Sequence, residues 1–188
     1  MFYLREGDIT RFSGDVIVNA ASPCLHHGSG VCGAIHNAAG PDLLVACRNH
    51  IRAYGKPRVG TVVLTSPGRL LCRGVIHAVG PRWLSGLWAG RSDNLLAQVY
   101  LRALRLARDN GFSSIAFPCI STGHYFYPHD RAARIALSTI ITFLTNIAPD
   151  LDVYHSPRIL PQRLRMFIPD LHVCYPVFTC VFSFFCMK

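Results

Sequence analysis

Lysine is nearly absent from this chain of 188 residues, and charged residues of any kind are scarce. Lys56 and Lys188 are the only lysines, so arginine supplies almost all of the basic charge behind a formal net charge of +9. Charged residues make up 15% of the chain and hydrophobic residues 51%, which excludes a disordered chain and predicts one compact domain. A guanidinium group can hydrogen-bond two phosphate oxygens at once, so the arginine excess is compatible with nucleotides, nucleic acid or polyanionic modifications as binding partners. It is equally compatible with a solvated surface that binds none of them.

Signals for metal binding, secretion and membrane insertion are also missing. The eight cysteines form no CxxC pair and no Cys/His spacing typical of zinc, so we expect no metal or other cofactor and reduced thiols in an intracellular protein, in cytoplasm or nucleus. The start, MFYLREGDIT, lacks the apolar stretch of a signal peptide. Val173 to Met187 is shorter than the about 18 to 20 apolar residues of a membrane span and contains Pro176, which favours a buried or strand-like tail.

Short apolar runs alternate with amphipathic stretches along the chain. The runs predict strands at Val16 to Ala20, Gly60 to Thr65, Val75 to Val79 and Ser114 to Pro118. The amphipathic stretches predict helices at Val31 to Ala39, Asp42 to Tyr54, Asp93 to Asn110 and His129 to Asn146, the third with Ser92 as its N-cap and Gly111 as its stop. This alternation predicts an α/β domain with a mainly parallel sheet covered on both faces.

Two glycine-bearing loops follow buried strands, where α/β proteins bind their ligands. In the first, Gly28, Ser29 and Gly30 precede a helix, so free N–H groups and the positive end of the helix dipole favour an anion. In the second, Ser121 to Gly123 supply hydroxyl donors, and Tyr125 offers an aromatic face for a sugar or base. Each loop alone is compatible with ordinary turn chemistry. Together, on neighbouring strands, they favour a diphosphate ligand.

The chain resembles the macro domain family of ADP-ribose-binding modules, and within it the branch of ADP-ribosyl hydrolases and O-acetyl-ADP-ribose deacetylases. The resemblance implies a three-layer α/β/α sandwich with a mixed, mainly parallel central sheet. The matching stretches run in family order and are Gly7 to Thr10 (GDIT), Asp15 to Ser22 (DVIVNAAS), Gly28 to Leu43, Gly60 to Thr65, Val75 to Trp83, Ser114 to Pro128 and Ala132 to Leu144. Residues 1–148 would form the macro domain and 149–188 a divergent tail, in which Asp152 to His155 could supply the last strand.

The resemblance also implies a set of ADP-ribose ligands. Asp8, beside the Ile9 backbone, would accept the adenine amino group, the alternative being a cap of the turn at Thr10. Asn19 would organise the first loop. The remaining implied ligands are Ser29, Gly30, Val31 and Gly33, which would line the diphosphate and distal ribose together with Cys32, and Ser121, Thr122, Gly123, His124 and Tyr125, which would close over the phosphates. Tyr125 could equally be a plain core aromatic.

Three positions depart from the family pattern. Ser22 stands where an asparagine usually holds the distal ribose or the attacking water, and Cys32 stands where cellular hydrolases carry an aspartate that helps to activate water. These two are the candidate catalytic positions. Some viral macro domains that count as hydrolases also carry cysteine there, so the second departure does not exclude activity. Phe126 replaces a common glycine, and a positive φ there would strain phenylalanine.

Two functions therefore fit. The first is a hydrolase that removes mono-ADP-ribose from Asp or Glu, or deacetylates O-acetyl-ADP-ribose, with a bound water and no metal. The alternative is a non-catalytic reader of ADP-ribose or poly(ADP-ribose). RNA binding through Arg102, Arg105 and Arg108, which share a helix face, is a third option, although such a stripe is commonly a solvated surface. We expect a monomer that acts on ADP-ribosylated protein or free ADP-ribose, away from membranes.

Overall fold

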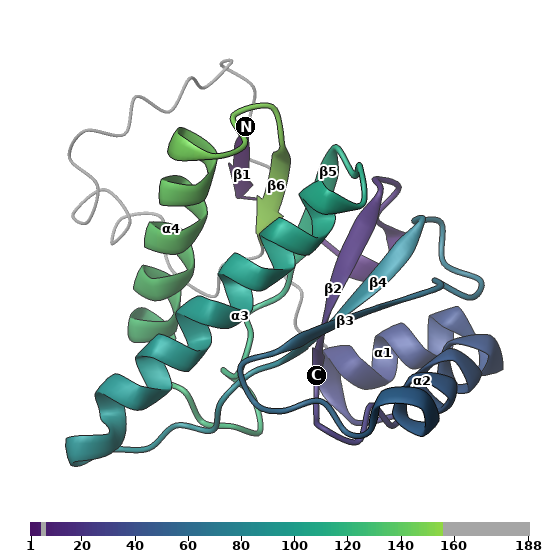
Figure 1. Ribbon diagram of the computed structural model, residues 1–188, viewed down its shortest axis with the longest axis horizontal. Helices are drawn as coiled ribbons and strands as arrows, with labels where there is room; N and C mark the ends of the chain where they lie inside the picture. The colour runs from purple at the N-terminus through teal and green to yellow at the C-terminus, as the bar shows by residue number, and fades with distance from the viewer. Residues whose placement is uncertain (5–6, 156–188) are drawn as a thin grey trace.

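The computed structural model describes residues 1–4 and 7–155, so Val173 to Met187 and the rest of the tail from residue 156 lie outside it. Its centre is one six-stranded sheet with the order β1-β6-β5-β2-β4-β3 (Figure 1). The strands are β1 (Phe2–Leu4), β2 (Val16–Ala21), β3 (Val62–Thr65), β4 (Gly74–Val79), β5 (Ser114–Phe117) and β6 (Asp152–His155). Every neighbouring pair is parallel except β3 and β4. The prediction of a mixed, mainly parallel sheet is confirmed.

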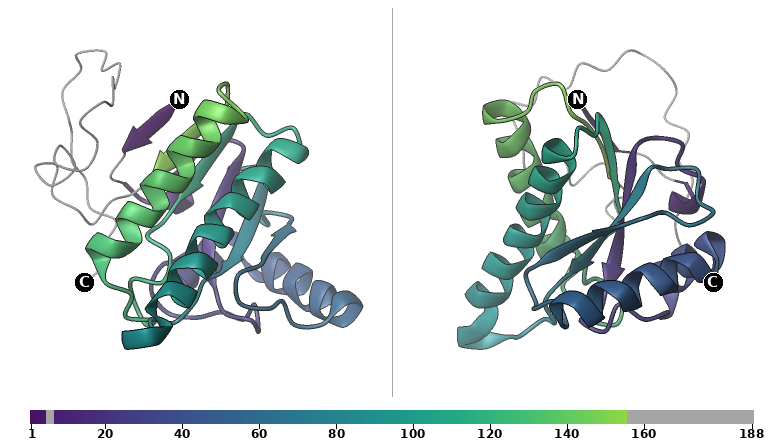
Figure 2. Two further views of the ribbon diagram at one scale, coloured as in Figure 1. Left: turned by 60° about the vertical axis from the view of Figure 1, so that its left-hand side comes forward. Right: turned by 45° about the vertical axis from the view of Figure 1, so that its right-hand side comes forward.

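Helices cover both faces of this sheet. They are α1 (Gly30–Ala39), α2 (Pro41–Tyr54), α3 (Ala89–Asp109) and α4 (His129–Asn146), with short 3-10 turns η1 (Ile9–Arg11) and η2 (Gly86–Trp88). Figure 2 shows α3 and α4 side by side on one face, with α1 and α2 on the other. The molecule is therefore the three-layer α/β/α sandwich that the family resemblance implied.

The side chains of β2 show why one strand can serve two cores. Val16 and Val18 pack into the cluster beneath α3 and α4, whereas Ile17 and Ala21 pack into the cluster beneath α1 and α2. Alternate residues of a strand point to opposite faces, so a continuous apolar run is what a doubly covered strand requires. The same face as Ile17 and Ala21 carries the buried polar Asn19, which belongs to the site described below.

Most predicted elements are confirmed to within two residues, but α3 begins at Ala89 rather than at Asp93. Ser92 is therefore not its N-cap. The turn η2 leads directly into the helix, so no side-chain cap is needed at Ser92, whose buried hydroxyl instead donates to the Arg82 carbonyl oxygen at 3.3 Å. No helix among the described residues is long and apolar enough to cross a bilayer.

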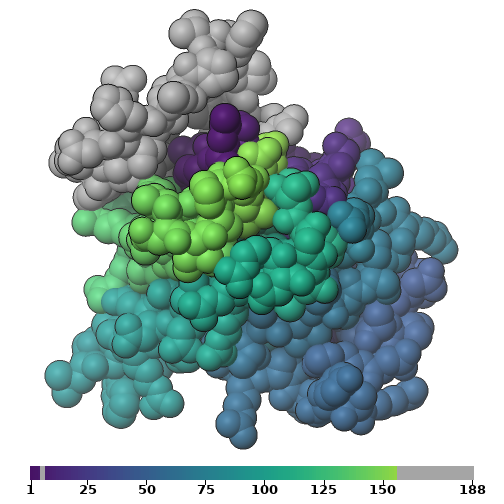
Figure 3. Space-filling view, turned by 45° about the horizontal axis from the view of Figure 1, so that its top comes forward, coloured from purple at the N-terminus to yellow at the C-terminus, as the bar shows by residue number. Residues whose placement is uncertain are grey.

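Strand β1 is absent from the sequence-based prediction because it has only three residues and one partner. It pairs with β6, and the amino group of Met1 donates to the Leu151 carbonyl oxygen at 2.8 Å. Figure 3 shows this N-terminal segment, in purple, against the yellow-green end of the described chain. Because β6 also pairs with β5, the sheet includes residues beyond position 148.

Candidate functional site

The two glycine-bearing loops leave the same edge of the sheet, because β2 and β5 are adjacent and parallel. Asp15 ties the starts of these strands together. Its carboxylate accepts from the Ser113 backbone N–H at 2.7 Å, from the Ser114 N–H at 3.2 Å and from the Arg73 guanidinium at 2.9 Å. Partial burial opposes ionisation, but the hydrogen bonds from Ser113 and Arg73 outweigh it and lower the pKa of Asp15 to about 2. This carboxylate thereby joins the starts of the two strands, at the opposite end of the strands from the loops.

The first loop runs from Ser22 to Ser29 and continues into the first turn of α1, which begins at Gly30 and includes Cys32 and Gly33. Ser22 is half-buried directly after β2, and its carbonyl oxygen accepts from the Leu25 N–H at 3.0 Å. Ser29 and Gly30 are exposed at the start of α1, and Val31 is half-buried beside them. The first N–H groups of a helix have no partner within the helix, so they are available to an anion at this place.

Cys32 and Asn19 form the floor of the first loop. Asn19 is fully buried, and its Nδ2 lies 3.6 Å from Cys32 Sγ and 3.1 Å from His77 Nδ1. Burial raises the pKa of the Cys32 thiol, although contacts with Asn19 and the Gly28 backbone partly offset the effect. At neutral pH Cys32 is therefore an uncharged thiol and does not act as a general base.

The second loop, from Cys119 to Tyr127, folds onto itself. Tyr127 N–H donates to the Ser121 carbonyl oxygen at 3.1 Å, and the Thr122 hydroxyl donates to the Cys119 carbonyl oxygen at 3.0 Å. Ser121 has a φ of +67°, and its buried hydroxyl has no partner in the structure. A buried hydroxyl without a partner is costly, so the second loop carries one unsatisfied polar group, which lies against Gly80.

A brace from two helices holds the second loop. The Tyr127 hydroxyl donates to Asp93 of α3, and Arg131 of α4 pairs with the same carboxylate. Hydrogen bonds from Arg131, and then from Tyr127, lower the pKa of Asp93 despite its partial burial. The Arg131 guanidinium also lies 5.1 Å from the centre of the Trp83 ring, which packs against Tyr127. No sequence motif links these residues, so the pattern of the chain did not predict the brace.

The loops meet across the edge of the sheet. Ser29 Oγ lies 3.4 Å from Nδ1 of the exposed His124 ring, which brings one implied ligand from each loop into contact. Tyr125 is half-buried, its carbonyl oxygen accepts from the Trp83 N–H at 2.9 Å, and Arg82 lies 5.1 Å from the centre of its ring. Gly123 beside it is exposed. The two loops therefore bound one shared site.

Asp8 lies on a neighbouring element. It caps η1, and its Oδ1 accepts from the Thr10 N–H at 2.9 Å and from the Thr10 hydroxyl at 2.6 Å. Oδ2 lies 3.9 Å from Arg11 Nε, and half of the side chain is exposed (51%). The turn η1, with Ile9 buried, contacts α1. The capping role is thus present, and one carboxylate oxygen has no donor closer than Arg11.

Phe126 has the positive φ that its sequence position suggested. Its φ is +52°, and its ring is 79% exposed. A positive φ is unfavourable for a residue with a Cβ, so the backbone here is strained in the middle of the second loop.

Two buried histidines, His36 and His77, and the arginines on one face of α3 remain to be described. His77 is satisfied by Asn19 and by Thr65 Oγ1 at 2.9 Å, as expected of a core histidine. His36 differs from His77, because its buried Nε2 has no hydrogen-bond partner in the structure. In the stripe on α3, Arg102 donates to the Gly60 carbonyl oxygen and Arg108 pairs with Asp109, which favours the structural explanation.

Comparisons with known proteins agree with this geometry. The macro domain family matches residues 18–136, and the chain belongs to this family. It is 48% identical to the O-acetyl-ADP-ribose deacetylase of Escherichia fergusonii over 152 residues, which is 81% of this chain and 85% of that one. The corresponding enzyme of Citrobacter rodentium is 50% identical with the same coverage.

Solved structures give the same result. The Oceanobacillus iheyensis macrodomain with ADP is 41% identical and superimposes with a TM-score of 0.76 over 88% of this chain and 87% of that one. The Trypanosoma brucei macrodomain in complex with ADP-ribose is 36% identical, with a TM-score of 0.72 over 82% of this chain and 63% of that one.

Proposed function

We propose that this macro domain binds ADP-ribose and hydrolyses its esters, with O-acetyl-ADP-ribose and mono-ADP-ribosylated Asp or Glu as the substrate class. One observation carries the proposal. Two loops that bear hydrogen-bond donors follow the ends of the adjacent parallel strands β2 and β5, and they meet where Ser29 contacts His124. The relatives named O-acetyl-ADP-ribose deacetylase support hydrolysis, and the neighbours with ADP and ADP-ribose support the ligand.

In this proposal the ligand lies across both loops. Asp8 accepts the adenine amino group through the oxygen that does not cap η1, and the Ile9 backbone lies beside the base. The N–H groups of Gly30 and Val31 at the start of α1 face the diphosphate, and Gly33, whose own N–H donates to the Ser29 carbonyl oxygen at 3.4 Å, lines the distal ribose. The set from the second loop consists of Ser121, Thr122, Gly123, His124 and Tyr125.

The reaction adds one water across an ester bond and yields ADP-ribose and a carboxylic acid. Cys32 is a neutral thiol, so it does not remove the proton of the water efficiently. In the mechanism that the family resemblance implies, the attacking water is bound by the substrate's own phosphate. In this proposal the loops contribute position and electrostatic stabilisation, and no metal takes part.

The test compares the release of ADP-ribose from an ester with the binding of free ADP-ribose. The full chain is incubated with O-acetyl-ADP-ribose and, separately, with a protein mono-ADP-ribosylated on glutamate, and free ADP-ribose is titrated by calorimetry. We expect turnover of at least one ester and binding of ADP-ribose. Binding without release from either ester would establish the reader alternative, and absence of both would refute the site.

Ser22→Asn is the informative variant, because it restores the longer side chain of the family at the ribose or water position. We expect turnover to rise several-fold with little change in ADP-ribose affinity. Cys24→Ala, a change in the same loop at a position outside the implied ligand set, serves as the control. Equal turnover in the Asn variant and the parent would show that Ser22 is not limiting.

The cellular location, the oligomeric state and the extent of the domain are part of the same proposal. The cysteines that the structure describes form no disulfide with one another, which supports an intracellular protein, in the cytoplasm or the nucleus. We propose a monomer with ADP-ribosylated protein or free ADP-ribose as partner, and a macro domain that extends from residue 1 through β6 before the divergent tail. Poly(ADP-ribose) and RNA are competitors to include in the binding assay. RNA that free ADP-ribose fails to displace would point to a separate surface.

A further inference from the structure

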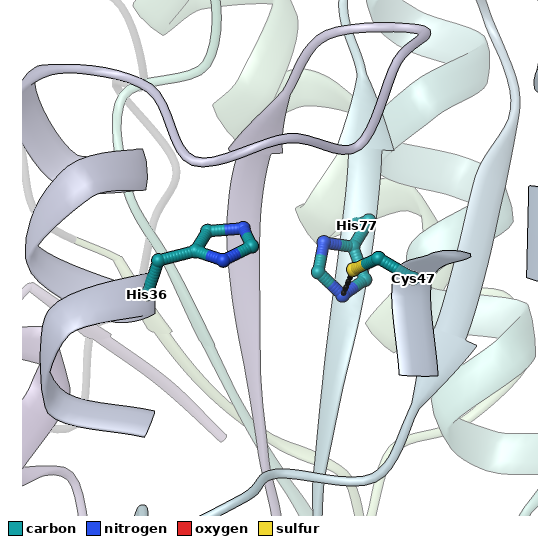
Figure 4. Close-up of side chains that lie close together, drawn as sticks. All are labelled: His36, Cys47 and His77. Atoms are coloured by element: carbon teal, nitrogen blue, oxygen red, sulfur yellow. Dashed lines mark hydrogen bonds between the residues drawn. The ribbon is translucent and has the colours of Figure 1, made fainter. Parts of the chain in front are cut away.

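Three buried donor groups converge behind the first loop, between α1, α2 and β4. His36, Cys47 and His77 each offer one ligand atom, and these atoms all lie within 4.8 Å of one another (Figure 4). His36 is 4% exposed, and Cys47 and His77 are fully buried. The residues are far apart in the sequence and come from three elements, so no spacing rule reveals the cluster.

The distances suit a small thiophilic cation. Cys47 Sγ lies 3.6 Å from His77 Nε2. With Zn–S bonds of about 2.3 Å and Zn–N bonds of about 2.0 Å, two ligands of one tetrahedral zinc lie roughly 3.5 Å apart. The remaining ligand, a ring nitrogen of His36, needs to approach by about 1 Å, which a side-chain rotation on α1 supplies.

His36 supplies an independent observation that points to a ligand. Its Nε2 is buried without a hydrogen-bond partner, and its ring faces His77 across the cluster (Figure 4).

We propose that His36, Cys47 and His77 form a zinc-type metal site, separate from the ADP-ribose cleft. As the metal binds, the Cys47 S–H bond breaks, its proton leaves to solvent and the thiolate takes the metal, while the two imidazoles donate lone pairs. One proton is released, and no group is oxidised or reduced. Thr65 Oγ1, at 2.9 Å from His77 Nε2, is an oxygen beside the cluster that can provide or hydrogen-bond the fourth ligand.

Asn19 can support the metal-bound ring. Its Nδ2 faces His77 Nδ1 in the structure, which places the ring proton on Nε2, toward Thr65. A metal on Nε2 moves that proton to Nδ1. If the Asn19 amide turns, its Oδ1, which is buried without a partner, accepts from Nδ1–H. Metal-binding histidines are commonly oriented by such a second hydrogen bond.

The test uses cobalt as a coloured substitute for zinc. Because the three donors are buried, the full chain is unfolded, refolded with Co²⁺ and dialysed, and its metal content and absorption spectrum are measured. We expect one bound cobalt with a thiolate-to-cobalt charge-transfer band, and displacement of the band by Zn²⁺. Refolded protein without bound cobalt, or cobalt without the thiolate band, would overturn the proposal.

Variants assign the ligands. Cys47→Ala is expected to abolish the charge-transfer band, and His36→Gln to weaken cobalt binding at least tenfold. The control is Cys72→Ala, which removes a buried free thiol outside the cluster and should keep both the band and the cobalt affinity of the parent. ADP-ribose titration and circular dichroism verify that each variant is folded, and Cys47→Ser replaces the alanine variant if that one does not refold. A band that persists without the Cys47 thiol would contradict the assignment.

Discussion

The two loops of the site occupy equivalent places after neighbouring strands but are held in different ways. The second loop is braced by the ionic network of Asp93, Tyr127 and Arg131, which reaches it from two helices. The first rests on weaker contacts to sulfur, between Asn19 and Cys32, and on close backbone packing at Gly33. Charge-assisted hydrogen bonds are about twice as strong as neutral ones, so the second loop is the rigid wall of the site.

The three positions that the resemblance marks as departures from the family lie in both parts of the site. Ser22 follows β2, and Cys32 lies in the first turn of α1 in contact with Asn19. In the second loop the position is Phe126, whose ring is exposed and makes no part of the brace.

The largest expected effect is on the first loop. A Cβ at position 33 would lie 2.5 Å from the Gly28 carbonyl oxygen, a backbone atom that cannot move away cheaply, whereas a Cβ at Gly80 would press on the Ser121 hydroxyl, a side-chain atom, and on Ile120. We expect Gly33→Ala to destabilise the fold by about 3 kcal/mol and to weaken ADP-ribose binding at least about tenfold. Denaturant titration and calorimetry measure both effects.

Two comparisons give this prediction its controls. Gly80→Ala should cost less than Gly33→Ala, since side-chain atoms can adjust. Gly90→Ala, where the added Cβ meets nothing within 4 Å, should be neutral or slightly stabilising. If Gly33→Ala binds ADP-ribose as well as Gly90→Ala does, the first loop is more adaptable than its packing indicates.

The next effect concerns the starts of β2 and β5, which Asp15 joins, rather than one loop. Its folded pKa of about 2 lies below the usual 3.8, so its stabilisation is complete above about pH 4 and is lost as the pH falls towards 2. Asp15→Asn should therefore cost about 2 kcal/mol at neutral pH and flatten the acid slope of stability. Thermal midpoints between pH 5 and pH 2 test this. Equal slopes in the variant and the parent would exclude Asp15 as the cause.

A smaller effect should be confined to the second loop. Tyr127→Phe removes the hydroxyl that joins the loop to Asp93 but leaves the Arg131 ion pair in place. We expect a loss of about 1.5 kcal/mol in stability and several-fold weaker ADP-ribose binding, with Tyr54→Phe, an exposed tyrosine on α2, as the neutral control. Unchanged binding would mean that the brace does not position the loop.

The smallest effect is a gain in stability. Phe126→Gly relieves a φ of +52° and should stabilise the protein by about 1 kcal/mol, whereas Phe126→Ala keeps the strain and should not. Chemical denaturation separates the two variants. An equal gain in both would assign the effect to loss of the exposed ring rather than to the backbone.

Local pattern was sufficient for most of the fold. Continuous apolar runs such as Val16 to Ala20 are what a doubly covered strand needs, and helical spacing placed α4 at its observed bounds. The two glycine-bearing loops could also be predicted from local pattern, because glycine spacing and helix starts are local properties. The positive φ at Phe126 was raised only by the family resemblance, which implies a common glycine at that position. The start of α3 was not predicted correctly, because the 3-10 turn η2 leads into the helix where a side-chain cap at Ser92 was expected.

The scarcity of lysine and the absence of metal-binding motifs are visible in the sequence alone. They narrowed the classes of ligand to consider, but they did not show which residues would bind a ligand. The arginine excess suggested phosphate ligands, yet Arg73, Arg102 and Arg131 each bind a group within the protein. Absent zinc spacing did not foretell that His36, Cys47 and His77 converge in three dimensions. Local periodicity is encoded over a few residues, whereas a brace or a ligand cluster depends on which elements the sheet order brings together.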